Sequence, residues 1–172
     1  MTSSSSPGVS LKQEGISYLA GAELPAVIVN VMRGGPGLGS IQPSQADYWQ
    51  ATRAPGHGDL HVLVFAPSSI QEMVDMVFDA FDLADCYRMP AMILADGMLG
   101  QMMEPISFPE KQVKTYDKSG WSTSGHQHKR AHHIVNSLYL QPEELEAKIL
   151  ERFQRYEEVK AKHTRCEEYL ME

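Results

Sequence analysis

Three short runs of consecutive apolar residues stand out along the chain, and each is ended by turn-forming residues. They cover residues 26–31, 62–66 and 91–95. Apolar residues in these runs are almost continuous and do not alternate with polar ones. This pattern is typical of strands that are covered on both faces of a parallel sheet, so we predict three buried strands.

A helical pattern separates the second and third runs. Its apolar positions recur every three or four residues: Ile70, Met73, Val74, Val77, Phe78 and Phe81. Acidic residues fill much of the opposite side, as in a helix that covers a core with one face. Ser68 or Ser69 can cap its first turn.

A second helix is expected near the amino terminus. Proline favours the first position of a helix, so Pro7 with Ser6 as the cap predicts a helix that ends near Gly21. The resulting order is helix, strand, loop, strand, helix, strand. This order predicts an α/β fold whose strands are parallel and joined by right-handed crossovers.

The chain changes character after residue 104. Residues 105–141 carry Pro, Gly, Ser and His without clear periodicity, which indicates an extended linker. A charged helix is expected to follow over about 142–163, because Pro142 and acidic residues stand in its first turn. We therefore divide the chain into an α/β part (1–104), the linker (105–141) and a helical part (142–172).

Composition and charge narrow the classes of partner. The chain has 172 residues, 42% of them hydrophobic, and a formal net charge of −7. An acidic balance argues against a nucleic-acid surface. No apolar run approaches the ~20 residues that span a bilayer, and the start of the chain lacks secretion-signal features. Cys86 and Cys166 lie far apart and give no iron–sulfur ligand set. We expect a cytoplasmic protein that binds small molecules or proteins.

A glycine-rich loop follows the first apolar run, in the stretch VMRGGPGLGSIQPSQAD (31–47). It matches neither the GxGxxG fingerprint nor a P-loop, and Pro43 stands where a phosphate-binding helix would begin. Arg33 lies at the carboxyl end of a strand, where open α/β sheets bind ligands. Its guanidinium suits a carboxylate, but it equally suits the carbonyl groups of its own loop. The pattern leaves both readings open.

Four serines precede the amino-terminal helix in TSSSSPG. Their hydroxyl groups and the free N–H groups of a helix start can form a site for an anion or a polar ring. The simpler reading is helix capping beside a frayed chain end.

Two histidine-containing stretches are candidate sites. HQHKRAHH holds four histidines, of which His128 and His132 are spaced as on one helix face, yet neither cysteine nor carboxylate completes a usual metal set. We expect no metal there. APGHGD places His57 and Asp59 on a turn, and turn formation is favoured over a role at a site.

Longer stretches of the sequence resemble a known family. MTSSSSPGVSLKQEGISYLAGAELPAVIVNVMRGGPGLGSIQPSQADYWQA, VLVFAPSSIQEM and PAMILADGMLGQM are similar to the alpha subunit of 2-oxoacid:ferredoxin oxidoreductases of the 2-oxoisovalerate and 2-oxoglutarate type. The resemblance extends through SLYLQPEELE. It implies part of a thiamine diphosphate-binding fold: the pyrimidine-binding domain, a three-layer αβα parallel sheet lacking its first strands.

The same resemblance implies an activity and its partners. The enzyme would join a 2-oxoacid and coenzyme A to give an acyl-CoA, carbon dioxide and reduced ferredoxin. In the family a partner subunit holds the diphosphate and its magnesium through a Gly-Asp-Gly motif, which this chain lacks. Iron–sulfur clusters would lie only on the beta and other partner subunits, so contact with ferredoxin would be indirect.

Roles for individual residues follow from the resemblance. It places Arg33 beside the thiazolium, facing the 2-oxoacid carboxylate, with Gln45 and Asp47 near the same pocket. The serine turn would contact the cofactor through Ser5, Ser6 and Gly8. No catalytic residue and no metal ligand is assigned to this chain.

The chain also departs from the family. An upstream strand and helix, and the glutamate that protonates the aminopyrimidine ring, are not found in this sequence. Without that glutamate the ylid forms poorly. We therefore expect a subunit fragment that is inactive alone. The alternative is a non-catalytic assembly module derived from the same fold, and the identity of the 2-oxoacid stays open.

Overall fold

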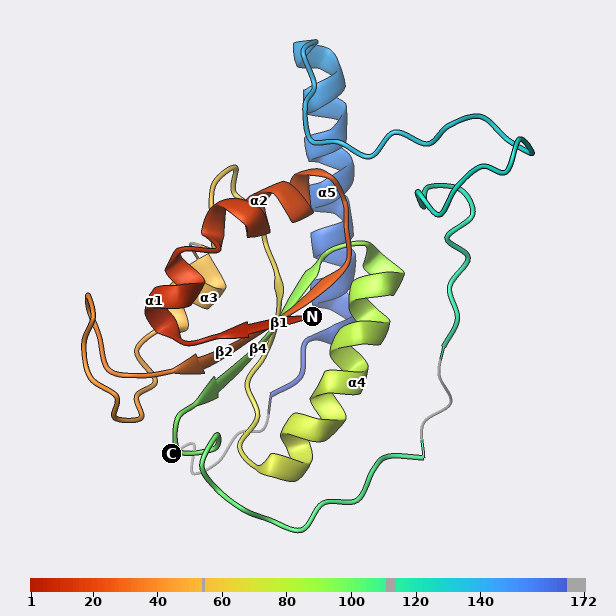
Figure 1. The fold of residues 1–172 in the computed structure, drawn as a ribbon. Coiled ribbons are helices and arrows are strands. Elements are labelled where there is room, and N and C mark those ends of the chain that lie inside the picture. The colour runs from red at the N-terminus through yellow and green to blue at the C-terminus, as the bar shows by residue number, and fades with distance from the viewer. Residues whose placement is uncertain (54, 111–113, 167–172) are drawn as a thin grey trace. The chain divides into compact units, whose positions relative to one another are not determined.

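The computed structural model describes residues 1–53, 55–110 and 114–166 (Figure 1). It consists of two compact units, Met1–Ser137 and Leu138–Glu172. The elements of the first unit are β1 (Thr2–Ser4), α1 (Ser6–Ser10), α2 (Gln13–Gly21), β2 (Ala26–Met32), α3 (Tyr48–Arg53), β3 (Leu63–Phe65), α4 (Ile70–Tyr87) and β4 (Pro90–Asp96). The second unit contains α5 (Pro142–His163).

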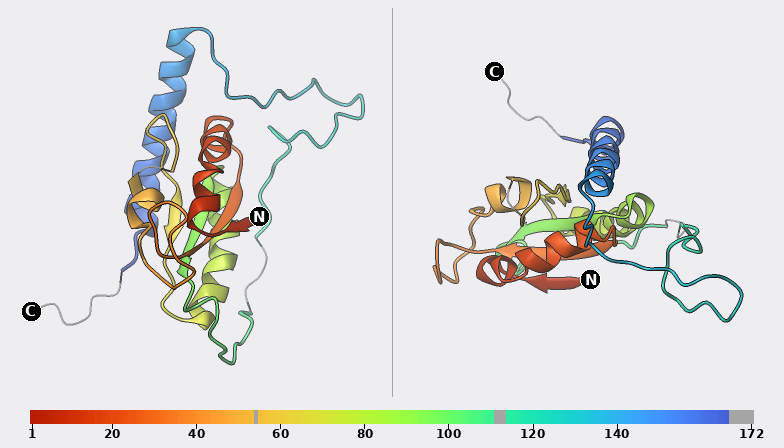
Figure 2. Two further views of the ribbon diagram at one scale, coloured as in Figure 1. Left: turned by 60° about the vertical axis from the view of Figure 1, so that its left-hand side comes forward. Right: turned by 90° about the horizontal axis from the view of Figure 1, so that it is seen from above.

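The four strands form one parallel sheet in the order β1-β2-β4-β3. This confirms the α/β fold, and β2, β3 and β4 match the three predicted strands to within one residue at each end. β1 is one of the two edge strands and lies beside β2, and β3 is the other (Figure 2). Because all strands are parallel, their carboxyl ends meet at one side of the sheet, here called the carboxyl edge.

Helices cover both faces of the sheet, with α1 and α2 on one side and α4 on the other (Figure 1). Side chains that alternate along the central strands make the first face, where the core consists of Val9, Ile16, Ala20, Ile28, Met32, Ala51, Leu60, Met92 and Leu94. Ala51 brings α3 to this face as well. On the other face α4 packs against β4, β2 and β3 and buries Ala80 and Ala84.

The predicted single helix with a cap at Ser6 is wrong in two respects. The segment forms two helices, α1 and α2, separated at Leu11 and Lys12. The break lets the Lys12 ammonium donate to Thr2 Oγ1 at 2.7 Å and to the Ser3 carbonyl at 2.9 Å. The cap position belongs to Ser5, whose side chain makes no capping bond.

The start of α4 follows the sequence prediction. Ser69 Oγ accepts a hydrogen bond from the Glu72 N–H at 3.1 Å, which is the N-cap contact expected of serine. The Glu72 carboxylate in turn accepts from the N–H and the hydroxyl of Ser68 at 2.6 and 2.8 Å. These reciprocal bonds fix the direction in which α4 leaves β3.

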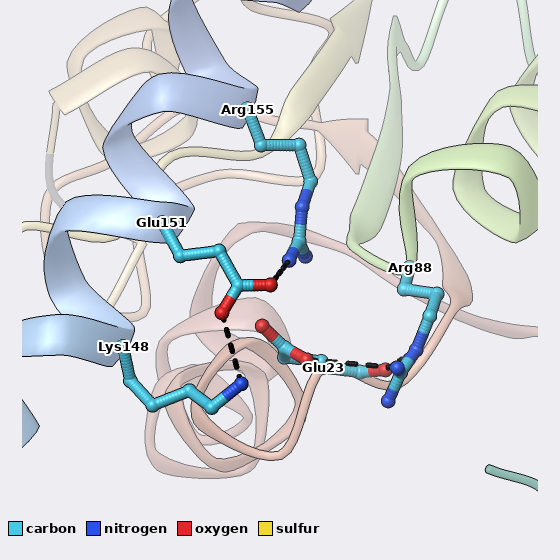
Figure 3. Close-up of polar contacts among 5 residues, drawn as sticks. All are labelled: Glu23, Arg88, Lys148, Glu151 and Arg155. Atoms are coloured by element: carbon cyan, nitrogen blue, oxygen red, sulfur yellow. Dashed lines mark hydrogen bonds and ion pairs between the residues drawn. The ribbon is translucent and has the colours of Figure 1, made fainter. Parts of the chain in front are cut away.

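A partly buried ion pair holds the opposite end of α4 (Figure 3). Arg88 ends the helix in the left-handed conformation. Its Nη1 lies 3.6 Å from Glu23 Oε2 and its Nε donates to the Glu23 carbonyl at 3.2 Å. The guanidinium also lies over the Trp121 ring, 4.5 Å from the centroid. This contact joins the segment before β4 to the segment before β2.

The segment after β4 runs along α4 before it leaves the sheet. Gln71 exchanges two hydrogen bonds with the Ser107 backbone, and Lys118 pairs with Asp85 at 2.6 Å. Burial, followed by the nearby Cys86 and acidic side chains, raises the pKa of Tyr116 in the same segment. The segment has no helix or strand over residues 97–110 and 114–141, in keeping with its sequence.

α5 begins at Pro142, as predicted, with Glu143 and Glu144 in its first turn. Within it Glu151 pairs with Lys148 at 2.9 Å and with Arg155 at 3.5 Å, three and four residues away (Figure 3). Such pairs stabilise an exposed helix modestly.

Candidate functional site

The serine turn lies at the carboxyl edge, between β1 and α1. β1 was not predicted, because three polar residues carry no strand pattern, yet it delivers the serines to the end of β2. Ser6 Oγ accepts from the Arg33 N–H at 3.1 Å and lies 3.4 Å from the Arg33 carbonyl, to which it donates. The hydroxyl of Ser6 therefore ties the turn to β2.

Ser5 and Gly8, the other two residues predicted to form the site at the serine turn, differ from Ser6 in their contacts. The hydroxyl of Ser5 is buried and has no hydrogen-bond partner within the described part of the chain. Gly8 donates its N–H to the Ser5 carbonyl at 2.7 Å, and a Cβ at this position would collide with the side chain of Ser4. A larger residue at position 8 would thus require the Ser4 side chain to move, whereas Ser5 retains unused hydrogen-bonding capacity.

The glycine-rich loop closes on itself beyond β2. Gly34 N–H donates to the Gln42 carbonyl at 3.1 Å, and Ser40 N–H donates to the Gly34 carbonyl at 2.8 Å. Arg33 also forms an isolated antiparallel bridge with Pro43. Gly39 has φ +62°, and a Cβ there would collide with the carbonyl group of Gly34. The loop is therefore a fixed structure that needs glycine for its closure.

Arg33 stands at the base of this loop, at the end of β2. Its Nη2 donates to the Leu38 carbonyl at 3.2 Å, which is the contact expected if the side chain stabilises its own loop. The Nε atom is buried and makes no hydrogen bond in the described chain. One donor of the guanidinium is thus used within the loop, and a buried donor is left over for a ligand.

Gln45 and Asp47 follow the loop and are both held by side chains of the sheet. Gln45 Nε2 donates to Asp96 Oδ2 at 3.2 Å. Asn30 Nδ2 donates to Asp47 Oδ2 at 3.0 Å, and the Asp47 carbonyl accepts from the Ala51 N–H in the first turn of α3. The sheet residues lie on neighbouring strands, with Asp96 paired in register to Met32.

Asn30 and Asp96 are not among the site residues predicted from the sequence, although the sequence carries a signal for each. Asn30 is fully buried, and its Oδ1 has no hydrogen-bond partner in the described residues. A polar residue inside an otherwise apolar run is the signal that marks it, because a buried amide requires partners. Asp96 carries a similar signal, since it ends a strand at the ligand-binding edge.

The carboxyl group of Asp96 is surrounded by hydrogen-bond donors. Its Oδ1 accepts from the N–H groups of Leu99 and Met98 at 3.0 and 2.9 Å. The bond from Leu99, with those from Gln45 and Met98, lowers the pKa of Asp96 below its usual value. Asp96 is therefore ionised at neutral pH. Together with Gln45 and Asp47 it forms what we call the acidic corner of the carboxyl edge.

Other candidates of the sequence lie elsewhere. The turn with His57 and Asp59 precedes β3, at the opposite side of the sheet, and the His57 N–H is bound by Ser17 Oγ at 2.9 Å. His126 and His132 have ring centroids 4.1 Å apart. Over residues 1–53, 55–110 and 114–166, no group of three or more His, Cys, Asp or Glu side chains has metal-binding geometry.

Comparison with known proteins decides the family. The family described as pyruvate flavodoxin/ferredoxin oxidoreductase, thiamine diphosphate-binding, matches residues 1–169. The chain belongs to this family. It is 52% identical over all 172 residues to the ketoisovalerate oxidoreductase subunit VorB of Methanothermobacter marburgensis, and covers 49% of that protein. It thus spans about half the length of this curated relative.

One further relative is similar in sequence, and one solved structure is similar in fold. The chain is 46% identical over 121 residues to the 2-oxoglutarate synthase subunit KorA of Methanothermobacter thermautotrophicus, which is 70% of this chain and 32% of that protein. Its fold is similar to a 2-oxoglutarate:ferredoxin oxidoreductase from Magnetococcus marinus, with a TM-score of 0.74 at 24% identity over 95% of this chain and 33% of the other. None of the helices in the described residues is long and apolar enough to cross a membrane.

Proposed function

We propose that this chain forms part of the alpha subunit of a cytoplasmic 2-oxoacid:ferredoxin oxidoreductase that depends on thiamine diphosphate. The reaction is the oxidative decarboxylation of a 2-oxoacid with coenzyme A to an acyl-CoA, carbon dioxide and reduced ferredoxin. The observation that carries this proposal is the 52% identity to a ketoisovalerate oxidoreductase subunit over the whole chain. It favours a branched-chain 2-oxoacid as substrate.

The carboxyl edge has groups that fit the cofactor. Ser5 presents a buried hydroxyl without a partner, and a buried polar group of this kind is stabilised by a polar ligand. Ser5, with Ser6 and Gly8 forming the turn around it, would hold the pyrimidine part of thiamine diphosphate. When bound, thiamine diphosphate supplies stabilisation of the carbanion at the carbon that loses carbon dioxide.

The substrate would be oriented by Arg33. A guanidinium binds a carboxylate through two parallel hydrogen bonds, and the buried Nε is a donor that the loop leaves unused. Gln45 and Asp47 border the same pocket. Because the loop is closed by backbone bonds before a ligand arrives, Arg33 would meet the carboxylate with little loss of conformational entropy.

The other components belong to partner subunits. These would hold the diphosphate with its magnesium and the iron–sulfur clusters, and would pass electrons to ferredoxin. Within this subunit, residues 1–104 would form the later part of the pyrimidine-binding domain. Residues 105–141 would link it to the helical part, 142–172, that leads to a second domain.

Assembly with the partner subunits tests the proposal. The purified complex is expected to reduce ferredoxin with coenzyme A and 2-oxoisovalerate, and to do so more efficiently than with 2-oxoglutarate or pyruvate. The chain alone should be inactive. A complex that assembles and binds thiamine diphosphate, but oxidises none of these acids, would favour the non-catalytic assembly module instead.

A further inference from the structure

The side-chain amide of Gln45 is hydrogen-bonded to the carboxylate of Asp96, which can accept hydrogen bonds but cannot donate them. Gln45 Nε2 lies 3.2 Å from Asp96 Oδ2, and Asp96 Oδ1 is occupied by the N–H groups of Leu99 and Met98. Three bonds to its oxygens keep Asp96 ionised, so it acts only as an acceptor. The amide nitrogen of Gln45, rather than its oxygen, must therefore face Asp96.

Two carboxylates adjoin Gln45: Asp96 is bonded to its amide, and a second follows closely in the chain. Asp47 follows two residues later, and its Oδ2 is bound by the neutral amide of Asn30. Neither Asp47 nor Asp96 forms an ion pair within the described part of the chain. Two carboxylates repel an anionic substrate group and favour a cationic group or an N–H donor.

We propose that Asp96 is a positioning residue, which fixes the Gln45 amide so that its Oε1 accepts a hydrogen bond from an amino group of the cofactor. This inference rests on the proposed function. Thiamine diphosphate and the 2-oxoacid differ in charge and in hydrogen-bonding capacity. Thiamine diphosphate carries an aminopyrimidine, which can donate, and a cationic thiazolium, whereas a 2-oxoacid offers only acceptors. In this arrangement Arg33 binds the carboxylate of the substrate, and the acidic corner binds the N–H donor of the cofactor.

Reversing the polarity of the contact tests the proposal. In Asp96→Asn the new amide still accepts from the turn N–H groups through Oδ1, but its NH2 group draws Gln45 Oε1 toward itself and removes the acceptor from the ligand. Gln45→Glu places two carboxylates together. In the double variant Gln45→Glu/Asp96→Asn the new amide donates to one carboxylate oxygen, and the other oxygen again serves as an acceptor.

The readout is the dissociation constant of thiamine diphosphate, measured by calorimetry on the assembled complex. We expect Asp96→Asn to weaken binding about 5- to 10-fold, as for one lost hydrogen bond, and Gln45→Glu to weaken it at least as much. The double variant should return to within about threefold of the wild type. Asp117→Asn is the matched control, because Asp117 also accepts a backbone N–H, from Ser119, but lies in the segment after β4.

Three results would overturn the proposal: unchanged or tighter binding in Asp96→Asn, a double variant as weak as Gln45→Glu alone, or an equal loss in the Asp117→Asn control. If Asp96→Asn fails to assemble, Gln45→Leu decides, because it removes the acceptor and leaves Asp96 intact. Unchanged binding there also refutes the proposal. A wild-type complex that binds no thiamine diphosphate would instead refute the proposed function.

Discussion

Removing the guanidinium of Arg33 is the most direct perturbation of the candidate site. In the assembled enzyme, Arg33→Ala would delete the proposed charge-assisted contact to the substrate carboxylate, and the loss should be on the order of 2–4 kcal/mol of transition-state stabilisation. That corresponds to a fall in kcat/KM of roughly 30- to 1,000-fold for the 2-oxoacid. Arg33→Lys should recover only part, because an ammonium cannot form two parallel bonds.

The structure predicts a small effect of the same substitution on the loop. Arg33 contributes one side-chain bond, to the Leu38 carbonyl, whereas the loop is also closed by backbone bonds of Gly34 with Ser40 and Gln42. This bond is exposed to solvent, so its loss should cost only about 1 kcal/mol or less. Melting of the complex should therefore change far less than kcat/KM does.

The assay is coenzyme A-dependent dye reduction with 2-oxoisovalerate varied and coenzyme A saturating. Arg53→Ala is the matched control, because Arg53 lies on α3 with its guanidinium over the Trp49 ring, 4.4 Å from the centroid. It should leave kcat/KM within about twofold of the wild type. An Arg33→Ala enzyme with unchanged kcat/KM would refute carboxylate binding and leave Arg33 as a loop residue only.

Four further outcomes are expected from the structure. Gly39→Ala should open the glycine-rich loop, because the added Cβ collides with the Gly34 carbonyl, and hydrogen exchange of the loop should rise at least tenfold while the melting temperature changes little. Arg88→Ala should destabilise the complex by about 1–3 kcal/mol in chemical denaturation, since it removes the ion pair with the Glu23 carboxylate, the hydrogen bond to the Glu23 carbonyl and the contact with the Trp121 ring, and a loss below about 0.5 kcal/mol would contradict this. Because the pKa of Asp96 is lowered in the folded state, its contribution to stability is fully present above the ordinary aspartate pKa of 3.8 and is lost as the pH falls through the lowered folded-state pKa, so Asp96→Asn should flatten acid unfolding in a pH titration. The isolated chain should associate, because β1 is an edge strand beside an apolar groove of about 770 Å3, and a stable monomer in light scattering would show otherwise.

The buried strands could be predicted because their sequence is decisive. β4 is buried from Pro90 to Ala95, and a run of this kind is compatible only with the interior of a sheet. β1 could not be predicted, since Thr2–Ser4 is polar and becomes a strand only through pairing with β2. The break between α1 and α2 was also not predicted; it is accompanied by a tertiary contact, that of Lys12 with Thr2 and the Ser3 carbonyl, which helical periodicity does not describe.

The candidate site was predictable in position but not in its contacts. Arg33 follows a strand, and the parallel order of strands then places it at the carboxyl edge. Its bond to Leu38 and the bond of Gln45 to Asp96, 51 residues further along the chain, depend on how the loop folds back. Helical and strand periodicity describe neighbours within an element, so they carry no information on such contacts.

The loop is attached to the sheet at three separate points, and this bears on how the site works. Ser6 binds the backbone of Arg33, Asn30 binds Asp47, and Asp96 binds Gln45. None of these contacts uses the guanidinium of Arg33. The positions of the loop residues are therefore set by the fold, so binding of a ligand costs little conformational entropy in this loop. It follows that substitutions at the attachment points should alter the positions of the loop residues, whereas removal of the Arg33 guanidinium should leave these three contacts in place.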